Sequence, residues 1–220
     1  MTTRSRIAIV EDHRLLGETV GLALELEGFA VIVPDLIDEL TLLGAVAPDP
    51  NTLVLLDLDL GPLGDATRFI PRYVAAGAAV LVVSGARDRM RFAATLEAGA
   101  LGYLSKDTAF DDLLETIRRA AAGDAVIDPN DRYQMLADLR VHRSAERSEL
   151  APFESLTPRE RQVLVELSAG KSVEAIAGEW VVSPATVRTQ VRGILTKLDV
   201  SSQLAAVAKA HAAGIIPARK

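Results

Sequence analysis

The sequence predicts an α/β fold, a five-stranded parallel doubly wound sheet, followed by a small all-α domain of four helices. Residues 1–125 alternate short apolar runs with segments of helical periodicity, which is typical of a parallel sheet covered by helices on both faces. Residues 155–220 contain four stretches that each begin with a helix-capping residue. We therefore expect domains at residues 1–125 and 155–220, joined by a linker at residues 126–154.

The elements of the first domain follow from apolar spacing. Five short apolar runs are the expected strands: Ile7–Val10, Val31–Val33, Leu53–Leu56, Val80–Val83 and Gly102–Leu104. Apolar residues at helical spacing mark the expected helices: Leu15–Leu26, Leu36–Val46, Ala66–Ala76, Met90–Ala98 and Phe110–Ala122. In open parallel sheets, ligands bind outside the carboxyl ends of the strands, so the residues there are the first candidates for a site.

The linker is expected to hold one helix and a tether. Tyr133, Leu136 and Leu139 have helical spacing after the Pro129 turn, and the charged stretch that continues to Pro152 is interpreted as the tether. In the second domain, the Thr-Pro-Arg-Glu run that begins at residue 157 is a capping box with proline at the first helical position. The next three N-caps are expected at Ser172, Ser183 and Ser201.

Composition excludes several classes of function. The 220 residues contain no cysteine, which removes disulfides, thiolate catalysis and cysteine-ligated zinc. The three histidines are too scattered to suggest a metal cluster. No apolar run reaches the roughly 18 residues that a spanning helix needs, and the first residues do not have the pattern of a signal peptide. We expect a cytoplasmic protein with no membrane partner.

Charge is divided unevenly between the two halves. Residues 1–150 carry 15 Lys/Arg and 24 Asp/Glu, a net charge of −9, whereas residues 151–220 carry 9 and 6, a net charge of +3. The acidic half would not attract nucleic acid at long range, and the basic half would not be repelled by it. The charges therefore predict two domains with different partners.

Polar residues follow four of the expected strands. Glu11 and Asp12 come after the first, Asp57 after the third, Ser84 after the fourth and Lys106 after the fifth. Carboxylates brought together repel one another, and a divalent cation with hard oxygen ligands, such as Mg²⁺, relieves that repulsion. The ammonium and the hydroxyl could bind a phosphoryl oxygen. This set predicts an acyl phosphate site on Asp57.

The stretch LVLLDLDLGPLGD, residues 53–65, allows other interpretations. Its Asp-x-Asp is also the spacing of nucleophile and general acid in haloacid-dehalogenase-like enzymes, and a buried strand that ends in solvated acids is the simplest alternative. The order of motifs favours phosphorylation of the first aspartate alone. An acidic pair precedes this strand by two strands, and no second acidic pair follows Ser84 where such an enzyme would supply one.

The runs IVEDH, LLDLDLG, LVVSG and GALGYLSKD, in this order, resemble a response-regulator receiver domain across residues 4–123. The resemblance implies that Asp57 is the phosphoacceptor, assisted by Ser84 and Lys106. It implies Mg²⁺ bound by Asp12, Asp57 and the backbone carbonyl of Asp59, with Glu11 acting through water. Ser84 and Tyr103 match the switch positions. One departure is Gly61 before Pro62, where the family usually has proline at the earlier position; it affects the loop rather than the chemistry.

The third helix of the second domain, SPATVRTQVRGILTKLDV, has a basic face without acids before Asp199. It follows a short helix and a tight turn, as a recognition helix does. Residues 156–210 resemble the LuxR-type DNA-binding domain, so the whole chain resembles a NarL/FixJ-type response regulator. The resemblance implies that Arg188, Thr189 and Arg192 face base edges, with Thr186, Gln190 and Lys197 nearer the phosphates. Family residues are replaced at four positions: Val173, Gln190, Gly193 and Gln203.

The expected function is a two-component response regulator that is not an enzyme. A sensor histidine kinase would phosphorylate Asp57, and the surface of the fourth and fifth helical segments would change its partner. Dimerisation, helped by the last helix, would then allow DNA binding at paired half-sites and regulation of transcription. The rivals are a phosphatase or phosphotransferase that uses Asp57, a protein-interaction module in place of the DNA-binding domain, and a regulator that works without phosphorylation.

Overall fold

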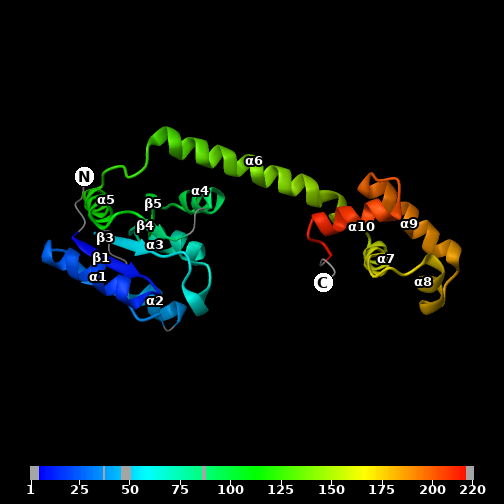
Figure 1. The fold of residues 1–220 in the computed structure, drawn as a ribbon, viewed down its shortest axis with the longest axis horizontal. Helices are drawn as coiled ribbons and strands as arrows, with labels where there is room; N and C mark the ends of the chain where they lie inside the picture. The colour runs from blue at the N-terminus through cyan, green and yellow to red at the C-terminus, as the bar shows by residue number, and fades with distance from the viewer. Residues whose placement is uncertain (1–4, 37, 46–50, 86–87, 217–220) are drawn as a thin grey trace. The chain divides into compact units, whose positions relative to one another are not determined.

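The computed structural model describes residues 5–36, 38–45, 51–85 and 88–216. The chain divides into two compact units, residues 1–140 and 141–220, and each unit is described by itself. Figure 1 shows the elements along the chain. No helix in the described ranges is both long and apolar enough to cross a membrane.

A five-stranded parallel sheet forms the centre of the first unit, with strand order β2-β1-β3-β4-β5. The strands are β1 (Arg6–Val10), β2 (Ala30–Ile32), β3 (Thr52–Leu56), β4 (Ala79–Ser84) and β5 (Gly102–Ser105). All four pairings are parallel, and the register places Val10 beside Leu56. The predicted doubly wound sheet is confirmed. Its register brings the residues that follow β1 and β3 side by side.

Five helices cover the sheet: α1 (Arg14–Leu26), α2 (Glu39–Ala45), α3 (Ile70–Ala75), α4 (Arg89–Glu97) and α5 (Phe110–Ala122). The helix expected over Ala66–Ala76 is instead a 3₁₀ turn, η2 (Ala66–Phe69), followed by α3. Pro71 lies in the first turn of α3, where its missing N–H costs no helical bond. The second expected helix begins at Glu39, and its expected end, Val46, lies outside the described residues.

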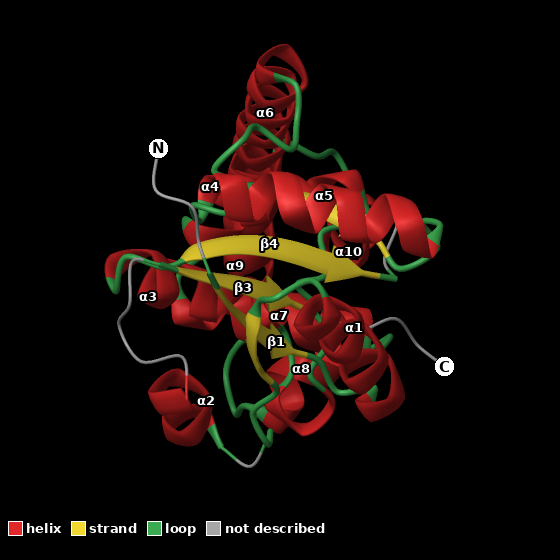
Figure 2. Ribbon diagram, turned by 90° about the vertical axis from the view of Figure 1, so that its left-hand side faces the viewer, coloured by secondary structure: helices red, strands yellow, loops and turns green. Residues whose placement is uncertain are grey.

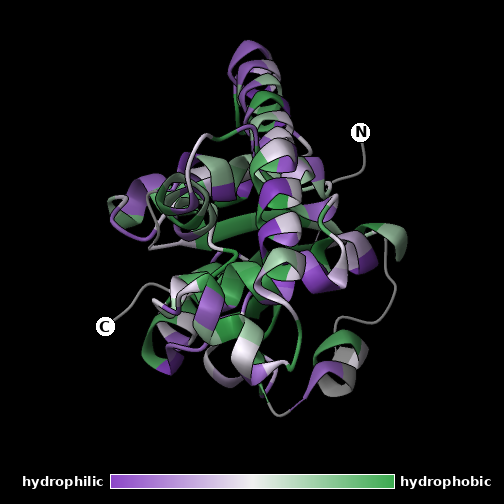
Figure 3. Cartoon of the chain, turned by 90° about the vertical axis from the view of Figure 1, so that its right-hand side faces the viewer, coloured by the Kyte–Doolittle hydropathy of each residue, from purple (hydrophilic) through white to green (hydrophobic). Residues whose placement is uncertain are grey.

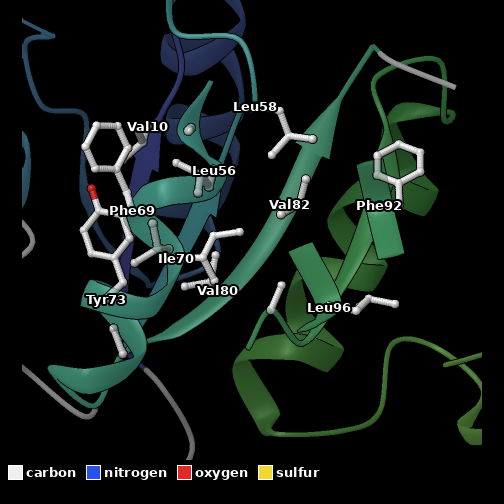
Figure 4. Close-up of a cluster of buried hydrophobic side chains, with 14 of the residues drawn as sticks. Val10, Leu56, Leu58, Phe69, Ile70, Tyr73, Val80, Val82, Phe92 and Leu96 are labelled. Atoms are coloured by element: carbon white, nitrogen blue, oxygen red, sulfur yellow. The ribbon is translucent and has the colours of Figure 1, made fainter. Parts of the chain in front are cut away.

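Alternate residues of the strands form two separate cores. Ile7, Ile9, Leu53 and Leu55 pack with α1 and α5, whereas residues one position further along pack with α2, α3 and α4. Figure 2 shows strands between layers of helices, and Figure 4 shows part of the second core, where Val10, Leu56 and Val82 lie among the helical side chains. Both faces of the central strands are therefore buried, which explains their continuous apolar sequence.

The expected tether is helical. A single helix, α6, runs from Pro129 to Glu154, so the prediction of an irregular charged stretch before Pro152 is wrong. Within the first unit, Met135 and Leu139 are 1% and 4% exposed in the core that contains α4. Arg132 donates to the carbonyl oxygens of three residues in the last turn of α4 and in the turn before β5: Leu96, Ala100 and Leu101. A stretch rich in long charged side chains is as compatible with a solvated helix as with an irregular linker. Figure 3 shows that hydrophilic and hydrophobic residues alternate along α6.

The second unit contains α7 (Pro158–Ser168), α8 (Val173–Glu179), α9 (Pro184–Leu198) and α10 (Gln203–Ala212). The predicted capping box is present, and the side chains of Ser172 and Ser183 cap α8 and α9. The cap of α10 is Ser202 rather than the expected Ser201, because its side chain accepts from Ala205 N. The four-helix domain with a short α8 before α9 is the predicted fold.

Candidate functional site

An acidic pocket forms where β1 and β3 end. Asp57 directly follows β3 and is 3% exposed, and Glu11 directly follows β1. Lys106, which follows β5, reaches both acids: its Nζ lies 2.8 Å from Asp57 Oδ2 and 2.7 Å from Glu11 Oε1. The parallel register explains this meeting of three residues that lie far apart in the sequence.

Burial and charge act against each other in this pocket. Burial raises the pKa of the Asp57 carboxyl, and the hydrogen bond from Lys106 only partly opposes that shift. Burial also opposes the charge of Lys106, but its hydrogen bonds to Asp57 and Glu11 dominate and raise the pKa of the ammonium. The pocket therefore holds a desolvated carboxylate beside a cation that stays charged.

The pocket has the donor set of a cation site. Oxygen or nitrogen atoms of Glu11, Asp12, His13 and Asp57 all lie within 4.8 Å of one another. Three of these residues offer carboxylate oxygens, the ligands that Mg²⁺ prefers, so the residues present fit that ion. His13 was not predicted as part of the site. Its Nδ1 lies 2.8 Å from Asp12 Oδ1 and 3.0 Å from Glu11 Oε1, and the hydrogen bond to Glu11 raises its pKa.

The two expected switch residues lie on neighbouring strands. Ser84 ends β4 and is fully buried, and its carbonyl oxygen accepts from Lys106 N at 3.0 Å. Tyr103 in β5 is half-buried, and its ring stacks on Phe92 of α4 with a centroid distance of 4.1 Å and an interplanar angle of 8°. A rotation of the Tyr103 ring would therefore change its contact with α4 directly.

The loop after β3 is bound to α4. Gly61 adopts φ +53° before Pro62, a conformation that favours glycine, in a 3₁₀ turn over Gly61–Leu63. The side chain of Asp59 forms a two-point ion pair with Arg91 of α4. Nothing in the sequence indicated Arg91, because an arginine in the first turn of a helix has many uses and its partners lie 26 and 32 residues away.

The predicted basic face of α9 is exposed in part, and one of its arginines pairs with an acid of α8. Arg188, Thr189 and Arg192 are exposed, and so is Thr186, whereas Gln190 is half-buried. Arg188 Nη2 forms an ion pair with Glu174 Oε1 of α8 at 2.7 Å. Both partners of that pair are more than half exposed, so it contributes little and can exchange for another anion.

Lys197 lies in a different environment from the arginines. Its Nζ is 2.6 Å from Glu160 Oε2, and Glu160 is buried at the N-terminus of α7. The same carboxylate oxygen accepts from Thr157 N and Thr157 Oγ1, so it links the capping box of α7 to α9. A Cβ at position 193 would lie 2.4 Å from Glu160 Oε1, which explains the glycine inside this helix.

Two family models match the chain. Residues 7–118 match the response regulator receiver domain, and residues 154–210 match the luxR family of bacterial regulatory proteins. The sheet with its acidic pocket and the helix-turn-helix domain thus define a two-domain transcription regulator.

Relatives match both domains together. The probable transcriptional regulatory protein NarL of Mycobacterium tuberculosis is 33% identical over 206 residues, covering 93% of each chain. The nitrate/nitrite response regulator NarP of Escherichia coli K12 is also 33% identical, over 205 residues and 93% of each chain. The crystal structure of full-length FixJ from B. japonicum matches with 26% identity and a TM-score of 0.44, covering 97% of this chain and 99% of that one. The chain belongs to the NarL/FixJ family of two-component response regulators, with a LuxR-type DNA-binding domain that regulates transcription.

Proposed function

We propose that a sensor histidine kinase phosphorylates Asp57 in the cytoplasm and that the acyl phosphate controls dimerisation and sequence-specific DNA binding. The observation that carries this proposal is the contact of the buried Asp57 carboxylate with Lys106 inside a pocket of acids. Such a carboxylate is desolvated, which favours its reaction as a nucleophile, and the ammonium can follow the charge onto a phosphoryl oxygen.

The chemical step is a phosphoryl transfer. An oxygen of Asp57 forms a bond to phosphorus, the P–N bond of the donor's phosphohistidine breaks, and the imidazole leaves with its nitrogen lone pair. Asp12, Asp57 and the Asp59 carbonyl would hold Mg²⁺, with Glu11 acting through water; the ion would offset negative charge on the phosphoryl oxygens. Lys106 and Ser84 would contact the phosphoryl group, since both lie at the same edge of the sheet.

Phosphorylation would act as a population shift. Ser84 would turn toward the phosphoryl group and Tyr103 would turn inward. Because Tyr103 stacks on Phe92, its rotation would change the packing of α4. In this structure α4 and β5 also contact the first part of α6, so the α4 surface that we expected to change its partner already contacts one within its own unit.

The first test is labelling with acetyl phosphate and Mg²⁺. We expect one label per chain, none on Asp57→Asn, and weaker Mg²⁺ binding by Asp12→Asn because one hard ligand loses its charge. Ser84→Ala should still accept phosphate and respond less by dimerisation. Undiminished label on Asp57→Asn would refute the assignment.

The second test concerns DNA. Arg192→Ala should lose about 1–3 kcal/mol of discrimination between a cognate and a scrambled duplex, because a bidentate base contact is removed. We propose Lys197 as a phosphate contact, so Lys197→Ala should weaken both duplexes alike and lower the salt slope by about one unit. Since Lys197 also pairs with Glu160, the melting temperature of each variant is needed beside the titration. Identical behaviour of the two variants would contradict this division of roles.

One rival remains for the same site, a regulator whose DNA binding does not depend on phosphorylation. Beryllium fluoride mimics the phosphoryl group, so its effect on DNA binding distinguishes the proposed regulator from this rival. The proposal requires that it raise both the mass and the DNA affinity of the wild-type protein and leave Asp57→Asn unchanged. DNA binding that is strong and insensitive to the mimic would support the rival.

A further inference from the structure

A single guanidinium, that of Arg91 in the first turn of α4, binds the loop after β3 at three residues. Its Nη2 and Nη1 lie 2.7 and 2.9 Å from the two carboxylate oxygens of Asp59. Its Nε and Nη2 lie 3.1 and 2.9 Å from Asp65 Oδ2, and Nη2 also donates to the Leu58 carbonyl oxygen. The Arg91 side chain is 22% exposed, whereas the Asp59 and Asp65 side chains are 67% and 53% exposed, so a partly buried guanidinium binds two carboxylates that reach solvent. Its two-point geometry with Asp59 distinguishes this contact from a single surface ion pair.

These contacts close the loop that carries the phosphoacceptor. Asp59 and Asp65 form an isolated antiparallel bridge, and the Asp65 side chain accepts from Thr67 N at 2.8 Å to cap η2. Arg91 therefore holds both ends of the turn between Asp59 and Asp65. Asp57 lies two residues before the held carboxylate, so a shift of the loop would act on it directly.

Electrostatics links the clamp to the pocket. A hydrogen bond from the Asp59 backbone acts on Asp57 in the direction that favours its charged form. Arg91 contacts both oxygens of the Asp59 carboxylate, and Asp59 lies two residues after Asp57 in the chain. Without Arg91, the Asp59 and Asp65 carboxylates would lose their cationic partner, and their negative charge would act on an anionic phosphoryl donor that approaches Asp57.

We propose that Arg91 is a positioning residue for phosphorylation of Asp57. It acts through Asp59 and Asp65: by pairing with both carboxylates it neutralises negative charge that would otherwise repel the anionic donor. This inference rests on the proposed phosphorylation of Asp57 and extends it to a residue of α4. Arg91 itself does not touch the phosphoacceptor in this role.

The test measures the labelling rate of the full chain by acetyl phosphate at saturating Mg²⁺. Arg91→Ala should label about three- to tenfold more slowly, since an anionic donor then meets uncompensated negative charge. Arg91→Lys keeps the charge and loses the planar guanidinium, so its labelling rate should lie between those of the wild type and Arg91→Ala. The deficit of Arg91→Ala should shrink as salt is added, because screening weakens repulsion and does not repair a loosened loop.

Two further variants separate charge from structure. Asp59→Asn in the Arg91→Ala background should restore most of the rate, because it removes the charge that Arg91 neutralised. Arg89→Ala is the matched control: it lies in the same helix turn and pairs with Asp138 at 3.3 Å, so it should label at the wild-type rate.

The outcomes are distinguishable. A wild-type chain that takes no label on Asp57 overturns both the proposed function and this inference. A labelled wild type with an equally fast Arg91→Ala overturns the inference alone. So does a slow Arg91→Ala that neither Asp59→Asn nor added salt improves, since that pattern shows a structural role only. The lysine variant keeps the test decisive if the alanine variant does not fold.

Discussion

At the scale of single residues, Gly193 shows how tertiary contact reverses a local rule. Glycine inside a helix costs about 1 kcal/mol relative to alanine, so α9 would be more stable with alanine there. The structure shows the opposite constraint, because a Cβ at this position would meet Glu160 Oε1 at 2.4 Å. The other oxygen of that carboxylate, Oε2, accepts from Thr157 N, Thr157 Oγ1 and Lys197 Nζ, so moving Oε1 aside would strain these bonds.

We therefore expect Gly193→Ala to lower the free energy of unfolding of the second unit by about 1–3 kcal/mol, the usual cost of overpacking. Gly178 in α8 is the matched control, since a Cβ there meets nothing within 4 Å and Gly178→Ala should stabilise by up to about 1 kcal/mol. Urea unfolding followed by Trp180 fluorescence measures both, because the chain has one tryptophan and it lies in this unit. A stabilising Gly193→Ala would mean that the Glu160 contact is easily displaced.

Glu160 also predicts a pH dependence. Burial works against its charge, but hydrogen bonds from Lys197 and Thr157 prevail and lower the pKa of its carboxyl. The folded-state pKa lies below the unfolded value of about 4.3, so this stabilisation is present above about pH 4.3 and is lost as pH falls through the folded pKa. Trp180-monitored unfolding should show stability falling in that window, with a shallower fall in Glu160→Gln. The exposed Glu154→Gln is the control and should follow the wild-type curve.

At the scale of elements, α6 and α4 matter most. The first part of α6 is packed into the core beside α4, and α4 carries Arg91 and Phe92 in succession. Arg91 binds the loop after β3, and Phe92 stacks on Tyr103, so one helix contacts the loop that follows Asp57, the aromatic ring of β5 and the start of α6. A displacement of α4 would therefore change all three contacts, because a close-packed interior transmits displacement.

The packing of α6 gives a prediction at this scale. Leu139→Ala should lower the free energy of unfolding of the first unit by about 2–4 kcal/mol, because Leu139 is 4% exposed. Val141→Ala, two residues later in the same helix, should be nearly neutral, because Val141 is 71% exposed. Calorimetry would measure both. A loss in Leu139→Ala no larger than that in Val141→Ala would show that the core contacts of Leu139 do not stabilise the first unit.

At the scale of the whole molecule, the chain consists of two units with separate cores and opposite charge balance. A ligand that binds only the folded first unit should stabilise that unit alone. Beryllium fluoride with Mg²⁺, at about one hundred times its dissociation constant, should add about 2.7 kcal/mol to the first unit and leave the Trp180 transition unchanged. Asp57→Asn should remove the effect. A Trp180 transition that moves by the same amount would show that the two units unfold together.

Periodicity and capping chemistry made most of the elements predictable from sequence. Each strand was a short apolar run, and β3 and β4 are buried along their whole length. Each cap in the second unit except that of α10 lay at the expected serine or threonine. The acids and the lysine of the pocket were predictable for one reason: in a parallel sheet, residues that follow the strands meet at one edge. The helical course of residues 141–154 was missed because a charged, weakly amphipathic stretch fits a solvated helix and a tether equally well.

The sequence by itself determined the fold class, the two domains, the acidic pocket at the ends of the strands and the basic third helix, since these depend on local pattern and strand order. Only the tertiary structure decided what Arg91, His13, Glu160 and Gly193 do. Each of them acts through a partner whose position depends on how the elements pack, or, for Gly193, through the space that a neighbouring side chain leaves for a Cβ atom. Those quantities are properties of three-dimensional contact, and residue spacing along the chain carries no record of them.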